Sequence, residues 1–186
     1  MLITHDELEK YIGQNVISPD AQPRKDGLLL TLGNNIQCLA ENNSKIIDPF
    51  SVEDLNCLYG AKINNWDEFI LRANEFVLFS TNEHINMGGI FYGFITTLTH
   101  VARLGLMTNL TSNFVDRTFH GQLILEIKNL TNFDFLLHKN MPIAKLLIFG
   151  QAEGNSVDFN EFIDPLIFKK EDELSSKYPK KFSIKR

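Results

Sequence analysis

Short apolar segments separated by turn-forming residues dominate the chain from residue 68 onward. The apolar segments are 69–71, 76–79, 90–95, 123–127, 133–137 and 143–149. The turn formers between them are Asn82, Gly88, Gly89, Gly105, Gly121, Asn129 and 140–142. Segments this short and this closely spaced are typical of an all-β sandwich or barrel, because a βαβ sheet needs helices between its strands. We therefore expect a mainly β fold.

The N-terminal part of the chain predicts a few further elements. Thr4 and Glu7 form a capping-box pattern, which indicates a short N-terminal helix that stops at Gly13. Residues 28–32 are typical of a buried strand, and 33–35 of a following turn. Residues 51–58 fit either a short helix or an irregular excursion, and residues near 158–162 fit a short helix.

We find no internal repeat and no dividing linker in the 186 residues, so a single domain is expected. Its core would be about 1–150, followed by a C-terminal arm of about 151–186.

Composition excludes several classes of protein. The formal net charge of −5 disfavours binding to nucleic acid in bulk. The two cysteines, Cys38 and Cys57, are too few for a disulfide framework or a structural zinc site. The N-terminus lacks the pattern of a signal peptide, and no apolar run is long enough to span a bilayer. We therefore expect a cytoplasmic protein with reduced thiols and no membrane partner.

Several familiar catalytic patterns are missing. Zinc-dependent base deaminases need His-x-Glu together with Pro-Cys-x-x-Cys, and only His5 stands two residues before a glutamate, at the start of the predicted helix. The sequence has no Gly-x-Ser-x-Gly elbow and no glycine-rich phosphate loop. Any hydrolysis by this chain is therefore expected to work without zinc.

Glu126 and Arg103 are the charged residues that stand out in apolar surroundings. Glu126 lies inside the segment 123–127, and a carboxylate among apolar neighbours is costly to bury unless it is paired. Such a group is suited to proton transfer. Strand residues alternate between faces, however, so Glu126 could also simply point outward. The residues alone leave both interpretations open.

The stretch 97–126 resembles the motif of the deoxycytidine triphosphate (dCTP) deaminases. That motif reads Gly-Arg-Ser-Ser-x-Ala-Arg-x-Gly, then Asp-x-Gly-[Phe/Trp]-x-Gly and Leu-Glu. The matching residues here are Ala102, Arg103, Gly105, Asp116, Phe119, Gly121, Leu125 and Glu126. Weaker similarities lie at 30–33, 47–49, 75–83 and 140–145. The similarity covers the chain from its N-terminal helix to about residue 150.

The resemblance implies a dUTPase-like distorted β-barrel or jelly-roll with a short N-terminal helix, assembled as a homotrimer with active sites between subunits. It implies a dCTP or dUTP substrate and dUTP and ammonia as the products of dCTP deamination, with Glu126 moving the proton and Arg103 supporting the water. The implied substrate contacts are Thr99, His100, Leu110, Thr111, Ser112, Asp116, Arg117, Phe119 and Tyr178. Magnesium would bind mainly through the triphosphate.

The sequence departs from the motif at several positions. The Arg-Ser-Ser that holds phosphate oxygens in the family is Leu98, Thr99 and His100 here, and leucine cannot bind phosphate. The Pro-Gly or Ala-Gly pair after the aspartate is Arg117 and Thr118 here, which removes a glycine and adds a cation. The glycine that opens the motif is Thr97. The C-terminal arm keeps Tyr178 but lacks the following glycine. We expect Arg117 to replace part of the lost charge.

Two alternatives to a dCTP deaminase therefore remain. One is a dUTP-hydrolysing enzyme of the same fold, and the other is a catalytically silent nucleotide-binding or regulatory homologue.

Overall fold

The computed structural model of the chain describes residues 1–12, 21–41, 46–48, 50–110 and 112–150. The helices in these ranges are α1 (His5–Ile12), α2 (Val52–Leu58) and α3 (Thr99–Arg103). The strands are β1 (Gln22–Arg24), β2 (Gly27–Leu39), β3 (Tyr59–Asn64), β4 (Glu68–Leu71), β5 (Phe76–Asn86), β6 (Phe91–Thr97), β7 (Leu106–Met107), β8 (Phe114–Val115), β9 (His120–Asn129), β10 (Phe135–His138) and β11 (Pro142–Gly150). The expected mainly β fold is confirmed.

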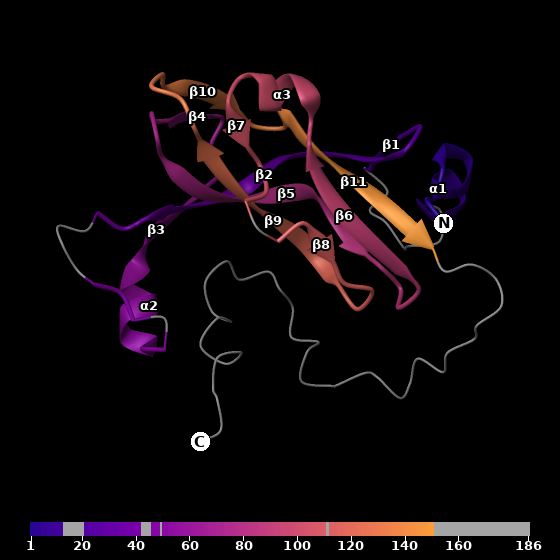
Figure 1. Ribbon diagram of the computed structural model, residues 1–186, viewed down its shortest axis with the longest axis horizontal. Helices are drawn as coiled ribbons and strands as arrows, with labels where there is room; N and C mark the ends of the chain where they lie inside the picture. Colours follow the sequence, from indigo (N-terminus) through magenta and orange to yellow (C-terminus); the bar gives the residue numbers. More distant parts are fainter. Residues whose placement is uncertain (13–20, 42–45, 49, 111, 151–186) are drawn as a thin grey trace.

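Most of the strands form one curled sheet in the order β7-β9-β5-β2-β11-β6-β8, with β1 and β3 added alongside β2 (Figure 1). The long strand β2 holds the two halves together. Its first residues pair with β11, and its later residues pair with β5 on one side and β3 on the other. The pairing of β2 with β5 shifts register between Leu32 and Ile36. Strands β4 and β10 form a separate two-stranded sheet.

The strands at the two ends of this order, β7 and β8, are short and are joined by a single segment of the chain. Strand β7 pairs with β9, whereas β8 pairs with β6 at the opposite end of the strand order. Residues 108–113 connect β7 to β8 in the sequence, and we call this segment the bridge. Its described residues, 108–110, 112 and 113, follow β7, which pairs with β9, and lead to β8, which pairs with β6. Strand β6 leads into α3, and β9 carries Glu126.

Alternating burial along the strands defines the core. In β9, Leu123, Leu125 and Ile127 are buried, while Glu126 and Lys128 lie on the other, half-exposed face. This is the period-2 pattern of a strand with one face against the core. The largest fully buried side chains come from α1, from β2, β4, β5, β7 and β9, and from the residue that follows β5: Leu8, Leu28, Leu30, Leu32, Ile36, Leu71, Phe79, Ile85, Met87, Leu106, Leu125 and Ile127.

Two expectations for local structure are confirmed. The carboxylate of Glu7 accepts a hydrogen bond from the backbone N of Thr4 at 3.1 Å, as in a capping box. Residues 52–58 form α2, and the Ser51 hydroxyl accepts a hydrogen bond from the backbone N of Asp54 at 3.2 Å. The predicted helix stop at Gly13 and the predicted helix at 158–162 lie outside the described residues.

Three predicted turns are wrong. Residues 33–35, Asn82 and Gly121 all lie within strands. Gly33 is needed for close packing, because a Cβ atom there would lie 2.5 Å from the carbonyl oxygen of Thr81. The amide of Asn82 donates to the Leu32 carbonyl and to Asn140 Oδ1, so this polar residue ties strands together instead of ending one. Within the described ranges, none of the helices has the length and apolarity needed to cross a membrane.

Candidate active site

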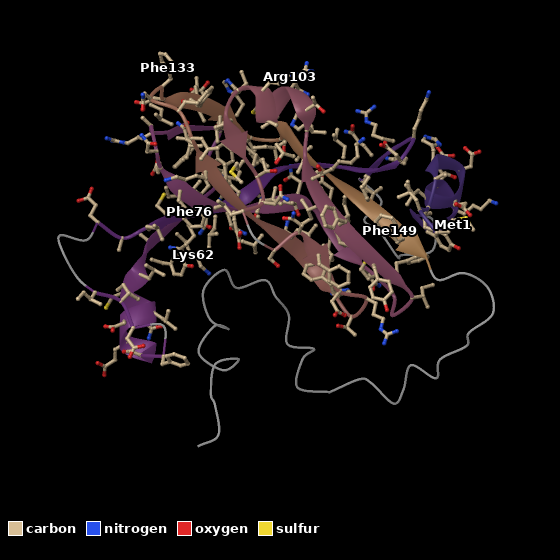
Figure 2. The ribbon with its side chains drawn as sticks, in the orientation of Figure 1. Met1, Lys62, Phe76, Arg103, Phe133 and Phe149 are labelled. Atoms are coloured by element: carbon tan, nitrogen blue, oxygen red, sulfur yellow. The ribbon has the colours of Figure 1, made fainter. Side chains whose placement is uncertain are left out.

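The segment after β6 carries the altered phosphate motif on the short helix α3. Leu98 precedes the helix, and its backbone N donates to the Ile143 carbonyl at 3.1 Å. The Leu98 side chain is half-buried and packs against the core cluster. Thr99, His100 and Arg103 are exposed. Leu98 is therefore part of the apolar packing, as is Val101 on α3, while Arg103 at the end of the helix faces solvent (Figure 2).

Strand β9 places Glu126 near the end of α3. The pairing of β7 with β9 sets Met107 opposite Lys128, and the Leu130 backbone N donates to the Gly105 carbonyl at 2.9 Å. The chain that leaves α3 after Arg103 is therefore fixed beside the end of β9. Glu126 lies two residues before Lys128 and on the same half-exposed face of the sheet. A carboxylate in this position can be reached by water and by a substrate.

The bridge is pinned to β6 by hydrogen bonds. The Asn109 amide donates to the Ile95 carbonyl at 3.1 Å and to Asn113 Oδ1 at 2.6 Å. The Ile95 backbone N donates to the Asn113 carbonyl at 2.8 Å. Both ends of the bridge are therefore held. Between them lie Leu110, which is half-buried, and Ser112, which is exposed. Thr111 and Tyr178, two predicted contacts, lie outside the described residues.

Asp116, Arg117 and Phe119 form a turn between β8 and β9. The Asp116 carboxylate accepts hydrogen bonds from Thr118, from its backbone N at 2.9 Å and from its hydroxyl at 3.0 Å. The Arg117 guanidinium carbon lies 5.8 Å from the centre of the Tyr92 ring, within the range of a cation–π contact. Asp116 is exposed, while Arg117 and Phe119 are half-buried.

The predicted site residues form two groups in a single chain. Arg103, Glu126 and the bridge lie around the end of β6 and the end of β9. Arg117 lies beside Tyr92 on β6. Tyr92 precedes Leu98 by six residues of extended chain, and this corresponds to about 20 Å at ~3.3 Å per residue. Phe119 precedes Glu126 by seven residues along an extended chain, a separation of similar size. Within a single chain, the Asp116–Phe119 turn therefore lies about 20 Å from Leu98 and from Glu126.

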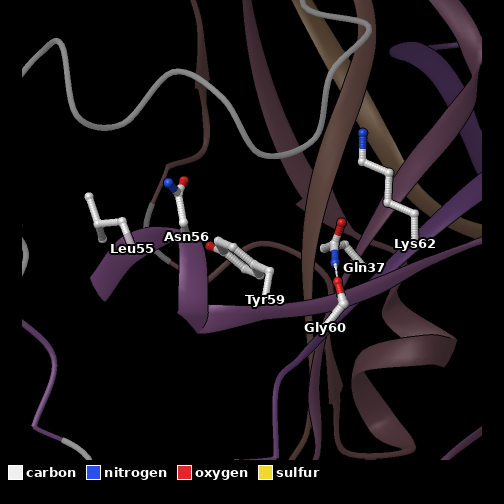
Figure 3. A pocket seen from close by; sticks show the side chains of 6 residues that line it. All are labelled: Gln37, Leu55, Asn56, Tyr59, Gly60 and Lys62. Atoms are coloured by element: carbon white, nitrogen blue, oxygen red, sulfur yellow. Dashed lines mark hydrogen bonds between the residues drawn. The ribbon is translucent and has the colours of Figure 1, made fainter. Parts of the chain in front are cut away.

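Sequence reasoning missed a polar pocket on the same sheet face as Glu126. Strand pairing sets Lys62 opposite Gln37, Gln37 opposite Leu78, and Leu78 opposite Glu126. The pocket has a volume of about 230 Å³ and is lined by Gln37, Leu55, Asn56, Tyr59, Gly60 and Lys62 (Figure 3). The buried Gln37 amide donates to the Gly60 carbonyl. Gln37, a polar residue within the largely apolar strand β2, could have pointed to this pocket from the sequence.

Sequence reasoning also missed the role of a buried carboxylate that links two strands. Glu83 accepts hydrogen bonds from the Thr31 hydroxyl at 2.7 Å and the Thr31 backbone N at 2.9 Å. Both residues are buried. The similarity of residues 75–83 to the deaminase pattern marked Glu83, but the pairing with Thr31 required the structure.

Comparisons with known proteins agree with the fold and the motif. A family model described as dCTP deaminase-like matches residues 2–151. A "dCTP deaminase, dUMP-forming" of Salinispora tropica is 35% identical over 103 residues, which cover 55% of this chain and 53% of the relative. A protein of the same name from Dictyoglomus thermophilum is 26% identical over 155 residues and 80% of each chain. The match to the Salinispora protein thus spans only about half of that relative's length.

Among solved structures, the 2'-deoxycytidine 5'-triphosphate deaminase of Agrobacterium tumefaciens superposes with a TM-score of 0.63. The two chains are 13% identical, and the match covers 79% of this chain and 47% of the other. At this identity the match supports a shared fold.

Proposed function

Because the chain belongs to the dCTP deaminase-like family, we propose that it hydrolyses the exocyclic amino group of a deoxycytidine nucleotide. The observation that carries the proposal is the position of Glu126. Its carboxylate is on a half-exposed strand face, beside the chain that leaves α3 after Arg103. A carboxylate held on a rigid strand and open to water is suited to general acid–base catalysis.

In the proposed reaction, Glu126 takes a proton from water, and the resulting hydroxide forms a bond to C4 of cytosine. The bond from C4 to the amino nitrogen then breaks, and Glu126 returns the proton to the leaving ammonia. The second water proton ends on ring nitrogen N3, so dCTP and water give dUTP and ammonia. General acid–base catalysis of this kind contributes typically ~10²–10⁴-fold to the rate. Arg103, exposed at the end of α3, would orient the water.

Further hydrolysis to dUMP is a second candidate outcome. The relatives from Salinispora and Dictyoglomus are both named dUMP-forming, and for this chain that activity would add the release of pyrophosphate. Magnesium would accompany the nucleotide, held mainly by phosphate oxygens and water, as is usual for this ion.

The separation of the site residues supports an assembly of several chains. Each group lies beside exposed apolar side chains. Phe94 and Phe114 are paired across β6 and β8 next to the Asp116 turn, and Leu104 and Leu130 lie next to the end of α3. A closed threefold ring joins two different surfaces at each interface. Contact between these surfaces would bring the Asp116 turn of one chain to the Leu98–Arg103 segment of the next, and we propose a homotrimer on this basis.

The main alternative to dCTP deamination is a homologue that binds a nucleotide without catalysis, and the packing of Leu98 favours it. The Leu98 side chain packs against the core, so the family's phosphate-binding arginine is replaced by a packing residue. Loss of one charged phosphate contact costs about 1.5–3 kcal/mol of binding free energy. A dUTP-hydrolysing enzyme is less well supported, because the Asp116 carboxylate already accepts two hydrogen bonds from Thr118.

One assay separates these possibilities. Purified protein is incubated with dCTP, dCMP or dUTP in the presence of Mg²⁺, and the release of ammonia and of pyrophosphate is followed. Ammonia from dCTP supports the proposal, and pyrophosphate in addition indicates dUMP as the product. Pyrophosphate from dUTP without ammonia from dCTP indicates a dUTP hydrolase. Nucleotide binding without either product indicates the silent homologue.

A further inference from the structure

Thr97, the residue that replaces the first glycine of the motif, is the centre of a hydrogen-bond network. Its hydroxyl accepts a hydrogen bond from the Thr108 backbone N at 3.2 Å. It lies 2.7 Å from the Thr108 hydroxyl and 3.0 Å from Asn109 Oδ1. Thr108 is fully buried. The last residue of β6 therefore holds the first two residues of the bridge.

The donors and acceptors of this network fit together without conflict. A threonine hydroxyl has one proton to donate and can accept two hydrogen bonds. Thr97 can accept from both the backbone N and the hydroxyl of Thr108 and donate to Asn109 Oδ1. The Asn109 amide then donates to Ile95 and Asn113. Glycine at position 97 could make none of the side-chain bonds.

The network fixes the part of the bridge on which base recognition would depend. Asn109 and Asn113 are both tied to β6, and Leu110 and Ser112 lie in the sequence between these two anchored residues. We call Leu110 and Ser112 the arch. We propose that Thr97 is a positioning residue that sets this arch and thereby controls how tightly the chain binds a deoxycytidine nucleotide. The proposal rests on the function proposed above, because it takes the arch as the surface that contacts the pyrimidine.

Three variants test the role of the hydroxyl. Thr97→Val removes it and keeps the side-chain shape, and Thr97→Ser keeps it. Thr131→Val is the matched control, because the Thr131 hydroxyl also donates to an asparagine, Asn129 Oδ1 at 2.9 Å, but lies outside the bridge. Hydrogen exchange of the backbone amides in 108–113 is measured without nucleotide, and calorimetry gives the affinities for dCTP and dUTP.

In Thr97→Val we expect faster amide exchange confined to the bridge, because the variant loses the hydrogen bonds of the Thr97 hydroxyl to Thr108 and Asn109. We also expect about tenfold weaker binding of dCTP, which is of the order of the net contribution of one hydrogen bond. Thr97→Ser should stay within about twofold of wild type, and Thr131→Val should change neither readout. If Thr97→Val does not fold, Thr97→Gly is measured in its place.

Unchanged amide exchange in the bridge would overturn the proposal. So would faster exchange together with unaltered dCTP affinity, since Thr97 would then have only a structural role. If the wild type binds neither nucleotide, the proposed function fails, while the exchange data still test whether Thr97 holds the arch.

Discussion

Replacing Thr31 by valine should destabilise the fold by a magnitude that follows from the contacts of its hydroxyl. The hydroxyl donates to the buried Glu83 carboxylate at 2.7 Å and accepts from the Asn82 amide at 2.9 Å. Valine has nearly the same shape, so the change removes hydrogen bonds without opening a cavity. Asn82 keeps its bonds to Leu32 and Asn140, so the main loss is the bond to the carboxylate.

A hydrogen bond to a charged group contributes about 1.5–3 kcal/mol to the free energy of unfolding. For a chain of this size, 1 kcal/mol shifts the melting temperature by about 2–4 °C. Thr31→Val should therefore lower the melting temperature by about 3–12 °C. Thermal melting followed by circular dichroism measures this, at equal protein concentrations because oligomers melt in a concentration-dependent way.

Thr96→Val is the matched control, since Thr96 is a half-buried strand threonine whose side chain makes no hydrogen bond to the described part of the chain. It should melt within about 1 °C of wild type, in line with surface substitutions. A Thr31→Val variant that melts like this control would refute the assignment of Glu83 and Thr31 as a stabilising link between β5 and β2.

Three further predictions concern nucleotide binding, thiol reactivity and assembly. Arg117→Ala should weaken dCTP binding about tenfold at low salt and less at high salt, because a contact between guanidinium and phosphate is charge-assisted and screened by ions. Lys10→Ala, which removes an exposed cation of α1 outside the motif, is the calorimetric control. Equal affinity in wild type and Arg117→Ala would rule out the phosphate contact. Burial, and secondly the nearby Glu75 carboxylate, raise the pKa of the Cys38 thiol above its ordinary value. Because less thiolate is present near neutral pH, Cys38 should react with a disulfide reagent more slowly than the exposed Cys57, and its rate should keep rising into the alkaline range. Cys57→Ser should remove the fast phase, and a fast phase that persists would contradict this order. Light scattering at micromolar concentration should give the mass of three chains, whereas a stable monomer would contradict the composite site.

The sequence predicted the existence of the main strands better than their ends. The apolar runs located β4, β5, β6, β9, β10 and β11, because burial of alternate residues needs such runs. Gly33 and Asn82 misled the prediction for a tertiary reason. Gly33 makes room for the backbone of Thr81 on the neighbouring strand, and the Asn82 amide bonds to a neighbouring strand and to Asn140. Local composition carries no information about such contacts.

The candidate site was predictable as a set of residues and not as an arrangement. The motif identified Glu126 and Arg103. The structure places β9, which carries Glu126, beside the chain that leaves α3, which carries Arg103. Linear spacing did not reveal that Arg117 lies at the opposite end of β6 from Leu98. It also did not reveal why Leu98 is apolar, since its packing against the core depends on the curl of the sheet.

Turnover of dCTP by a Glu126→Gln variant tests the central claim most directly. Glutamine keeps the size and polarity of the side chain but cannot take a proton from water. We predict that the variant melts like wild type, binds dCTP within about twofold of wild type, and releases ammonia at least ~10²-fold more slowly, the range expected for loss of a general acid–base group. Lys128→Gln, on the same face of β9, should retain wild-type turnover. Ammonia release at the wild-type rate by Glu126→Gln would contradict the account.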